Sequence, residues 1–265
     1  MMQRTVSTRM DIAITGLSEM VFSIAVARES VIEAETISFL LDDVALNPNE
    51  IVDRHGSRLH KFAAGPGHLV VDYSAVVTGS AVPTPLDELD LITYLRPSRY
   101  CESDSLLPTA RSEFRGLRGH ELLTAVTLWV WERLKYVPGS SLVTDGAART
   151  LLARRGVCRD YAHLVIALLR ALDVPARMVS VYAPGLAPMD FHAVAEAFVD
   201  GQWWIVDATR LAPRQSMVRI ATGRDAADIA FLTNHWADLT LNALSVLAVV
   251  DELPSDDSQQ LLQLG

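Results

Sequence analysis

The amino-acid sequence predicts an α+β fold, in which an all-β region precedes a helical region and a second sheet. Residues 10–80 alternate apolar and polar types, are rich in β-branched residues and show no helical period of useful length. Within 117–136, apolar residues recur at three- and four-residue steps, as on one face of a helix. From residue 176 onward the period returns to two, and an Asp-Gly turn at 200–201 joins two strands.

Residues 1–82 are expected to form a small antiparallel β domain. Its strands are expected at 10–15, 20–26 and 68–77, separated by turns rich in Gly, Pro and Asn. Three histidines occur here, at His55, His60 and His68. Because they lack the close spacing of metal ligands, we expect exposed loop histidines and no metal site.

Residues 83–112 are expected to form a linker segment. The prolines of Val82-Pro83-Thr84-Pro85 stiffen the chain, so the domain boundary is placed near residue 82. A short helix is expected over 86–95, and Leu107-Pro108 is expected to break the structure that follows. Cys101 lies in this irregular segment with no apolar helix behind it, which makes it a poor candidate nucleophile.

Residues 113–253 are expected to form the second domain, followed by a loose polar tail at 254–265. Helices are expected at 117–136, 145–153 and 158–172, and strands at 176–182, 191–199, 202–209, 218–221 and 239–250. Cys158 falls at the start of the third helix. Backbone N–H groups and the helix dipole favour an anion at that position, and a thiolate is a strong nucleophile.

The Asp200-Gly201 turn sets a hairpin register that brings His192 and Asp207 together. With a two-residue loop, Val199 faces Gln202, and further out His192 falls diagonal to Asp207 on one sheet face. This diagonal spans about 7–8 Å between backbones, within reach of a side-chain hydrogen bond. A loop one residue longer would put the two side chains on opposite faces.

Two other side chains fit these roles less well. His163 lies five residues after Cys158, about 140° around a helix, and cannot easily face the thiol. Glu196 shares the face of His192 but lies ~13 Å along the strand. Cys158, His192 and Asp207 are thus candidates for nucleophile, base and orienting acid in thiol chemistry. Each also has an ordinary structural explanation: a buried cysteine, a backbone-bonded histidine and a turn-capping aspartate.

Composition limits the kind of partner. The chain of 265 residues has a formal net charge of −9, which argues against a nucleic-acid partner. No apolar run reaches the roughly 18 residues of a membrane helix, and no secretory signal is visible at the N-terminus. With only two cysteines there is no disulfide framework. We therefore expect a cytoplasmic protein that does not bind a membrane.

Four blocks of sequence resemble the bacterial transglutaminase-like superfamily of proposed cysteine proteases. They are Gly156-Val157-Cys158-Arg159-Asp160-Tyr161-Ala162-His163-Leu164, Val174-Pro175-Ala176-Arg177-Met178-Val179-Ser180, Asp190-Phe191-His192-Ala193 and Trp204-Ile205-Val206-Asp207-Ala208-Thr209. The resemblance covers about 115–250 and, more weakly, 10–80, which look like the β-rich transglutaminase-associated domain that often precedes this core.

The resemblance implies a papain-like, transglutaminase-like core with the nucleophile helix packed against an antiparallel sheet. It matches Cys158 to the nucleophile, His192 to the base and Asp207 to the orienting acid. Such proteins attack amide carbonyls through a thioester: water as acceptor makes a peptidase or amidase, and an amine makes a transglutaminase. No oxyanion-hole side chain can be matched, and the backbone N–H of Cys158 is the natural first donor.

The expected function is therefore a cysteine-dependent hydrolase or acyltransferase acting on peptide or isopeptide amides. Its partners would be a protein or peptide substrate and, for transfer, an amine co-substrate; no cofactor or metal is expected. The N-terminal domain could restrict the cleft, recruit substrate or support a homo-oligomer. The alternative is a non-catalytic peptide-binding or scaffold protein that retains the fold, because fold alone does not prove function.

Overall fold

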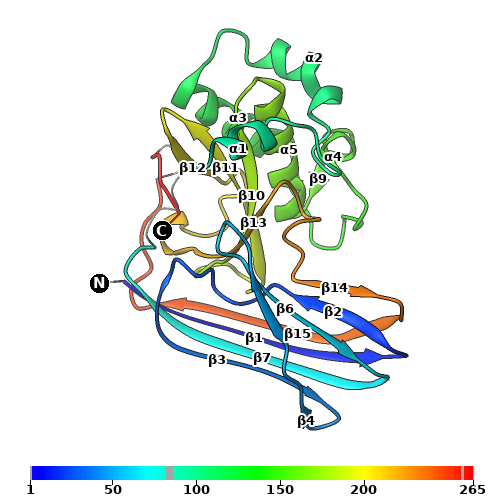
Figure 1. The fold of residues 1–265 in the computed structure, drawn as a ribbon. Helices are drawn as coiled ribbons and strands as arrows, with labels where there is room; N and C mark the ends of the chain where they lie inside the picture. Colours follow the sequence, from blue (N-terminus) through cyan, green and yellow to red (C-terminus); the bar gives the residue numbers. More distant parts are fainter. Residues whose placement is uncertain (1, 82–85, 258–259, 265) are drawn as a thin grey trace.

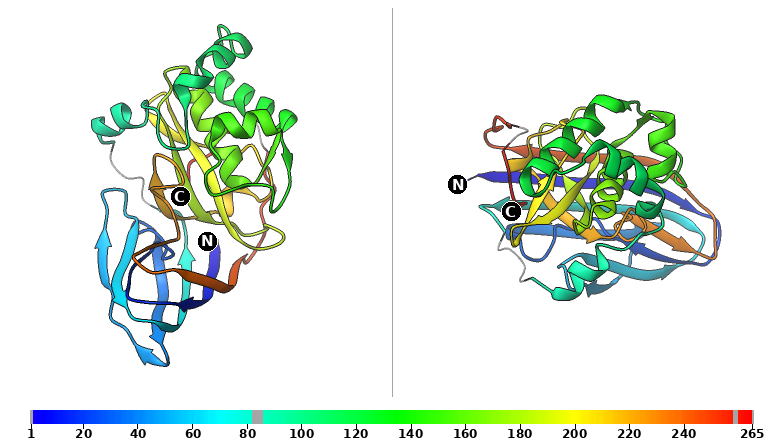
Figure 2. Two further views of the ribbon diagram at one scale, coloured as in Figure 1. Left: turned by 90° about the vertical axis from the view of Figure 1, so that its right-hand side faces the viewer. Right: turned by 90° about the horizontal axis from the view of Figure 1, so that it is seen from above.

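A β-sandwich packed against a mixed helix-and-sheet unit makes up the structure, a computed structural model that describes residues 2–81, 86–257 and 260–264. The two units are stacked, with the sandwich below the helical unit in Figure 1. The left panel of Figure 2 shows the same stacking from the side, with most helices on the part of the second unit away from the sandwich. This arrangement confirms the predicted α+β class and the β-rich character of the N-terminal region.

Two antiparallel sheets form the sandwich, in the orders β15-β1-β7-β3-β4 and β14-β2-β6-β5. The strands are β1 (Gln3–Ile14), β2 (Ser18–Phe22), β3 (Val31–Leu41), β4 (Val44–Ala45), β5 (Asn49–Val52), β6 (Arg58–Ala64), β7 (Gly67–Thr78), β14 (Leu232–His235) and β15 (Leu239–Val250). Every second residue of β1 is buried. The rings of Phe22 and Phe62 from one sheet pack on Phe39 from the other, so the apolar faces of the two sheets meet.

The last two strands join the N-terminal sheets. The strand expected at 239–250 is present, but β15 pairs with β1 along its whole length, and β14 pairs with β2. The range 113–253 expected for the second domain therefore ends in strands that hydrogen-bond to the sandwich. The alternation of β15 predicts a half-buried strand but carries no information about which sheet it joins.

A four-stranded antiparallel sheet and the helices on it form the second unit. The sheet has the order β12-β11-β10-β13. Its strands are β10 (Ala176–Tyr182), β11 (Phe191–Val199), β12 (Gln202–Val206) and β13 (Val218–Gly223), and η1 (Arg214–Ser216) is a 3₁₀ turn. The helices are α1 (Glu88–Thr93), α2 (Ser103–Glu113), α3 (Gly119–Arg133), α4 (Ala147–Ala153) and α5 (Cys158–Ala171), and a small parallel pair joins β8 (Lys135–Tyr136) to β9 (Arg155–Gly156).

Helix α2 corrects the expectation of an irregular linker. It runs through Pro108 because its buried face, Leu106 and Ala110, packs in the core beside α5. Tertiary packing outweighs the hydrogen bond that an internal proline removes. The short helix expected over 86–95 is α1. The predicted boundary at Val82-Pro83-Thr84-Pro85 lies outside the described residues.

The described part of the polar tail, 254–257 and 260–264, is held rather than loose. Arg214 Nε donates to Asp256 Oδ2 at 2.9 Å, and Arg214 Nη2 donates to the carbonyl of Gln260 at 2.9 Å. The backbone N–H of Ile205 donates to the carbonyl of Leu262 at 2.8 Å. The sequence signals only polarity here, whereas the partner, a buried arginine after β12, is distant in sequence.

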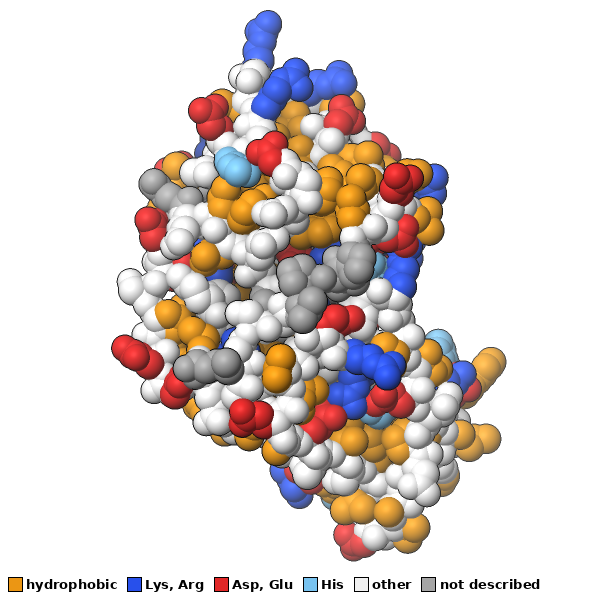
Figure 3. Space-filling view, turned by 60° about the vertical axis from the view of Figure 1, so that its left-hand side comes forward, with side chains coloured by type: hydrophobic (Ala, Val, Ile, Leu, Met, Phe, Trp, Pro, Cys, Tyr) orange, Lys and Arg blue, Asp and Glu red, His pale blue; other side chains and the backbone are white. Residues whose placement is uncertain are grey.

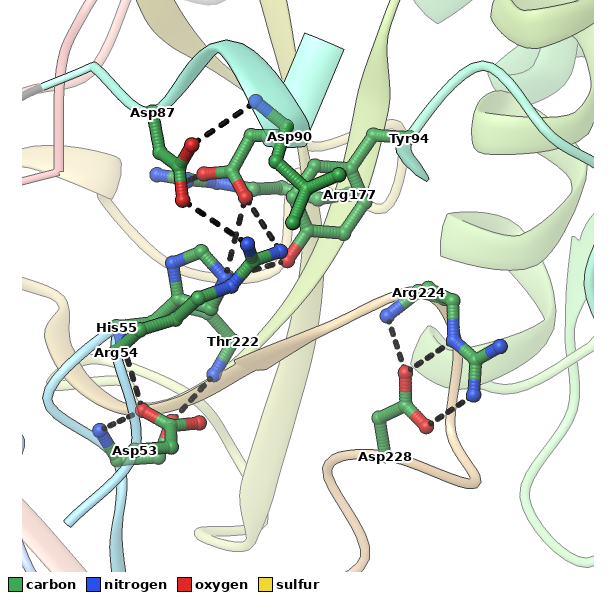
Figure 4. A network of polar contacts seen from close by, with 12 residues as sticks. Asp53, Arg54, His55, Asp87, Asp90, Tyr94, Arg177, Thr222, Arg224 and Asp228 are labelled. Carbon is green, nitrogen blue, oxygen red and sulfur yellow. Dashed lines mark hydrogen bonds and ion pairs between the residues drawn. The ribbon is translucent and has the colours of Figure 1, made fainter. Parts of the chain in front are cut away.

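Polar contacts fix the sandwich against the second unit. In Figure 4, Asp90 of α1 lies between Arg54, which precedes β6, and Arg177 of β10. Arg54 Nη2 is 2.7 Å and Arg177 Nη1 is 3.7 Å from the Asp90 carboxylate, which is buried. On the opposite side, Tyr182 Oη at the end of β10 is 2.7 Å from Thr8 Oγ1 of β1. These contacts make the junction between the units a fixed surface.

Two of the three N-terminal histidines are buried, His55 at this junction and His60 within the sandwich, contrary to expectation. His55 Nε2 lies 2.8 Å from Tyr94 Oη, and His60 packs on Phe39. His68 is exposed and pairs with Asp11. The sequence predicted exposed loops, but only His55 lies in a loop, where it meets α1, whereas His60 lies in β6 and points into the sandwich. Among the described residues, no group of three or more His, Cys, Asp or Glu side chains could hold a metal ion.

Acidic and basic side chains are interspersed over the face shown in Figure 3, with apolar side chains between them. That face therefore presents no broad area of one sign. Within the described ranges, none of the helices has the length and hydropathy needed to cross a membrane.

Candidate active site

Cys158 is the first residue of α5, as the sequence predicts. The helix is buried from Asp160 to Ala171, so it is held firmly between the sheet and the other helices. Asp160 fixes its start, because Oδ2 accepts from the N–H of Val157 at 2.7 Å and Oδ1 accepts from Ser141 Oγ at 2.9 Å. A Cβ at Gly156 would come within 2.6 Å of the Asp160 Cβ, so the close approach of the Asp160 side chain to residue 156 requires glycine there. The Cys158 side chain stays half-buried at the helix end.

The β11–β12 hairpin has the register worked out from its turn. Val199 faces Gln202, and the ladder runs back to Ala195 opposite Val206. Continuing outward, this register sets His192 and Asp207 on one face, and their side chains meet. His192 Nε2 lies 3.1 Å from Asp207 Oδ2, and both residues are buried.

Besides His192, Thr209 also hydrogen-bonds Asp207, and this residue was not singled out from the sequence. Asp207 Oδ1 accepts from the backbone N–H of Thr209 at 2.8 Å and from Thr209 Oγ1 at 2.7 Å. Both carboxylate oxygens therefore have defined partners, one side facing Thr209 and the other His192. The Asp-Ala-Thr spacing is a local signal that could have identified Thr209, because this geometry is an ordinary aspartate turn. Thr209 is thus a candidate positioning residue.

The charges around His192 favour its protonated form. Burial lowers the pKa of His192, but the Asp207 carboxylate, its hydrogen bond to the ring and the neighbouring Cys158 thiol outweigh burial and raise it to about 10. Burial likewise opposes ionisation of Asp207, and His192 with Thr209 reverse this, so the pKa of Asp207 is lowered. Since Nε2 faces Asp207, the other ring nitrogen, Nδ1, is the one available to the thiol; it is buried and makes no hydrogen bond to another residue.

Tyr136 is a further residue at the thiol that was not predicted. It ends β8 and pairs with Gly156 of β9, two residues before Cys158. The Tyr136 hydroxyl lies beside the backbone N–H of Cys158. Burial and the neighbouring Cys158 sulfur raise the pKa of Tyr136 to about 12, although the hydrogen bond from the Cys158 N–H lowers it. The hydroxyl is therefore protonated at neutral pH and can donate a hydrogen bond.

His163, the other candidate base, and Cys101, the other thiol, lie outside this site. His163 is fully buried one turn into α5, stacks on Tyr100 and accepts from the N–H of Ala226 at 3.2 Å. Burial lowers the pKa of His163 to about 3, which leaves it neutral. Cys101 is fully buried, and burial raises the pKa of its thiol. Neither side chain lines the cleft described next.

A cleft of about 550 Å³ opens at Cys158 and His192. Its walls come from β10, β11 and β13, from the segment 226–231, and from Ser23 and β14 of the sandwich. The thiol therefore faces a space that a substrate can enter. A sealed thiol would instead have favoured the scaffold alternative.

Similarity to known proteins agrees with this geometry. The family model of the transglutaminase-like superfamily matches residues 115–208. The crystal structure of a proposed cysteine protease from Cytophaga hutchinsonii is 33% identical, covers 96% of this chain and 92% of its own, and superposes with a TM-score of 0.86. The chain belongs to the transglutaminase-like superfamily. The resemblance inferred from four sequence blocks is thereby confirmed, as is the transglutaminase-like core.

Two mycobacterial proteins, both named only as uncharacterized proteins, are also similar to this chain. A protein of Mycobacterium leprae is 27% identical over 183 residues, which are 63% of this chain and 63% of that protein. A protein of Mycobacterium tuberculosis is 34% identical over 125 residues, 41% of this chain and 40% of that protein. The chain thus matches less than two thirds of the length of these relatives.

Proposed function

We propose that this protein is a cysteine-dependent hydrolase or acyltransferase that acts on peptide or isopeptide amides through a thioester. The observation that carries the proposal is the side-chain series at one cleft: the Cys158 thiol, the free Nδ1 of His192, and Asp207 bonded to His192 Nε2 at 3.1 Å. Membership of the transglutaminase-like superfamily supports it. The half-buried position of Cys158 in an open cleft favours this function over the scaffold alternative.

In the proposed reaction, the Cys158 sulfur attacks the amide carbonyl and the C=O electrons move onto oxygen. The imidazolium of His192, with its pKa raised to about 10, is protonated at neutral pH and gives the Nδ1 proton to the leaving nitrogen. The C–N bond breaks, a free amine departs and a thioester remains on Cys158. Neutral His192 then takes a proton from the second nucleophile, which attacks the thioester. Collapse of this adduct breaks the C–S bond and releases the Cys158 thiolate beside the imidazolium, the pair with which the reaction began.

The oxyanion formed in both steps needs hydrogen-bond donors. The backbone N–H of Cys158 is the first once the oxyanion takes the place of the Tyr136 oxygen as its acceptor, and we propose the Tyr136 hydroxyl, which lies beside that N–H, as the second. Water as second nucleophile gives a peptidase or amidase, and a primary amine gives a transglutaminase. The two unpaired cysteines suit the cytoplasmic location that the sequence predicts.

Thioester trapping tests the proposal. The protein is mixed with a peptide amide library, and acyl adducts are located by mass spectrometry with and without hydroxylamine, which cleaves thioesters. We expect hydroxylamine-sensitive adducts on Cys158, none in Cys158→Ala, and normal adducts in the control Cys101→Ser. Reaction with iodoacetamide at neutral pH should be much faster at Cys158 than at Cys101. Adduct formation that survives Cys158→Ala, or equal iodoacetamide rates at the two thiols, would remove Cys158 from the mechanism.

A further inference from the structure

The cleft beside Cys158 has mostly apolar walls. Met178, Phe191 and Ile220 line it from the sheet of the second unit, and Ile229, Phe231 and Leu232 line it from the opposite side. The rings of Phe191 and Phe231 stack with centroids 5.3 Å apart, which joins the residue next to His192 to the segment that leads into β14. The wall opposite the sheet is therefore fixed in place.

Charged groups are scarce in the same space. No carboxylate of the described residues lines the cleft, and its one arginine, Arg159, donates to Ser141 Oγ at 2.7 Å and to the carbonyl of Leu142 at 2.8 Å. A positively charged substrate side chain would lose water here without gaining an opposite charge, which is costly, and a carboxylate would meet Arg159 only in competition with Ser141 and Leu142. A large apolar side chain would gain about 1.5–3 kcal/mol on full burial.

Two buried hydroxyls in the cleft have no partner. Ser23 is 2% exposed and Ser180 is 9% exposed, and the Oγ of each makes no hydrogen bond in the part of the chain that is described. Their backbones are fixed, because Ser180 lies within β10 between β11 and β13, and the N–H of Ser23 donates to the carbonyl of Phe231 at 3.0 Å. Buried polar groups without partners are uncommon and costly. Both oxygens are buried in the unliganded protein, so each must rotate about χ1 toward the cleft, where a bound molecule that supplies hydrogen-bonding groups would satisfy it.

We propose that this cleft is the acyl-donor subsite, which takes a peptide with a large apolar side chain next to the scissile amide and hydrogen-bonds its peptide groups to Ser180 and Ser23. This inference rests on the proposed function and adds the substrate class to it. A peptide fits because it presents N–H and C=O groups beside each side chain, whereas a simple apolar ligand would leave both hydroxyls unsatisfied.

The subsite also gives the sandwich a role in recognition. Ser23 directly follows β2, and Leu232 begins β14, so both residues lie at the same sheet of the sandwich. The fixed junction through Asp90 and Tyr182 holds these residues opposite β10. The sandwich therefore restricts the cleft.

Peptidyl chloromethyl ketones test the subsite directly, since the Cys158 sulfur displaces chloride and the adduct is read by mass spectrometry. A series that differs only in the side chain next to the ketone, with Gly, Leu, Phe, Glu and Lys, is compared with iodoacetamide. We expect Leu and Phe probes to label Cys158 at least 10-fold faster than Gly, Glu and Lys probes. Equal rates along the series, or faster labelling by Glu or Lys probes, would overturn the proposal.

Variants separate recognition of the apolar side chain from hydrogen bonding to the peptide groups. Ala230→Leu, which adds volume to the half-buried wall, should slow the Phe probe at least 10-fold, and Leu232→Ala should weaken the preference for Leu and Phe over Gly. Ser180→Ala should slow every peptidyl probe by a similar factor, about 5-fold or more. Ala243→Leu on the exposed side of β15 is the matched control and should change nothing.

Iodoacetamide distinguishes failure of the subsite from failure of the proposed function. Cys158 that reacts rapidly with iodoacetamide but shows a flat side-chain series would overturn the subsite alone. Cys158 no more reactive than Cys101 would overturn the proposed function and the subsite with it. Unchanged iodoacetamide rates and unfolding temperatures in all variants show that the effects are on recognition.

Discussion

Replacing Asp207 with asparagine removes one charge from the proposed site and keeps its shape. Thr209 would still donate to Oδ1 through its N–H and hydroxyl, which are 2.8 and 2.7 Å away in the native protein. The new amide NH₂ would then face His192 Nε2 in place of the carboxylate oxygen at 3.1 Å. Because two donors cannot bond each other, neutral His192 would accept at Nε2 and carry its proton on Nδ1, the atom that must serve the thiol.

The expected loss of kcat in Asp207→Asn follows from the pKa of His192. Asp207 is the largest influence that raises this pKa to about 10, against burial, which lowers it. At 1.36 kcal/mol per pKa unit, the difference from an ordinary value of about 6.5 corresponds to roughly 5 kcal/mol in favour of the imidazolium. Without the carboxylate, burial remains and the pKa should fall to 6.5 or below. Loss of charge and the wrong tautomer together should reduce kcat on the order of 10³–10⁴-fold.

The sign of the stability effect is also defined. A raised histidine pKa stabilises the native protein fully below the unfolded value of about 6.5, and this contribution is lost as pH rises through about 10. The free energy of unfolding of the native protein should therefore fall between pH 6.5 and 10. This fall should be absent in Asp207→Asn. Urea unfolding at several pH values measures this loss.

Nuclear magnetic resonance titration of the His192 ring nitrogens measures the pKa directly, and steady-state kinetics on an amide substrate measures kcat. Asp72→Asn, which breaks an exposed pair with Arg9 on the sandwich, is the matched control and should leave both unchanged. A His192 pKa that stays near 10 in Asp207→Asn would refute the reasoning, whatever happens to activity.

Three further predictions concern other described residues. Tyr136→Phe removes the proposed oxyanion donor and should lower kcat about 10- to 100-fold with little change in KM; steady-state kinetics with full activity would contradict the role. Thr209→Val removes the hydroxyl that orients the Asp207 carboxylate and should lower kcat about 10-fold while the pKa of His192 in the ring-nitrogen titration moves only slightly; an undiminished kcat would leave Thr209 with a purely structural part. Glu196→Gln leaves the buried Arg177 and the half-buried Arg219 without their carboxylate, 2.8 and 2.7 Å away, and should destabilise the fold by about 3–5 kcal/mol in urea; an unchanged midpoint would show that these charges are already solvated.

Much of the candidate site could be predicted from the sequence because its signals are local. The Asp200-Gly201 turn determines the register of one hairpin, and the register alone puts His192 diagonal to Asp207. A cysteine between a glycine and an apolar run predicts a helix start within a few residues. Each inference needs only the geometry of neighbouring residues in one hairpin or one helix.

Other features were decided only by the tertiary structure, because they join segments that are far apart in the chain. Tyr136 reaches Cys158 through the short β8–β9 pair, and β15 crosses to β1 rather than to the sheet it follows. Hydrophobic alternation specifies that a strand has a buried face, but many sheets could bury it. Ser23 and Ser180 meet at one cleft for the same reason: each strand pattern is satisfied locally, and only the packing of the two units places their hydroxyls beside the thiol that the sequence had already located.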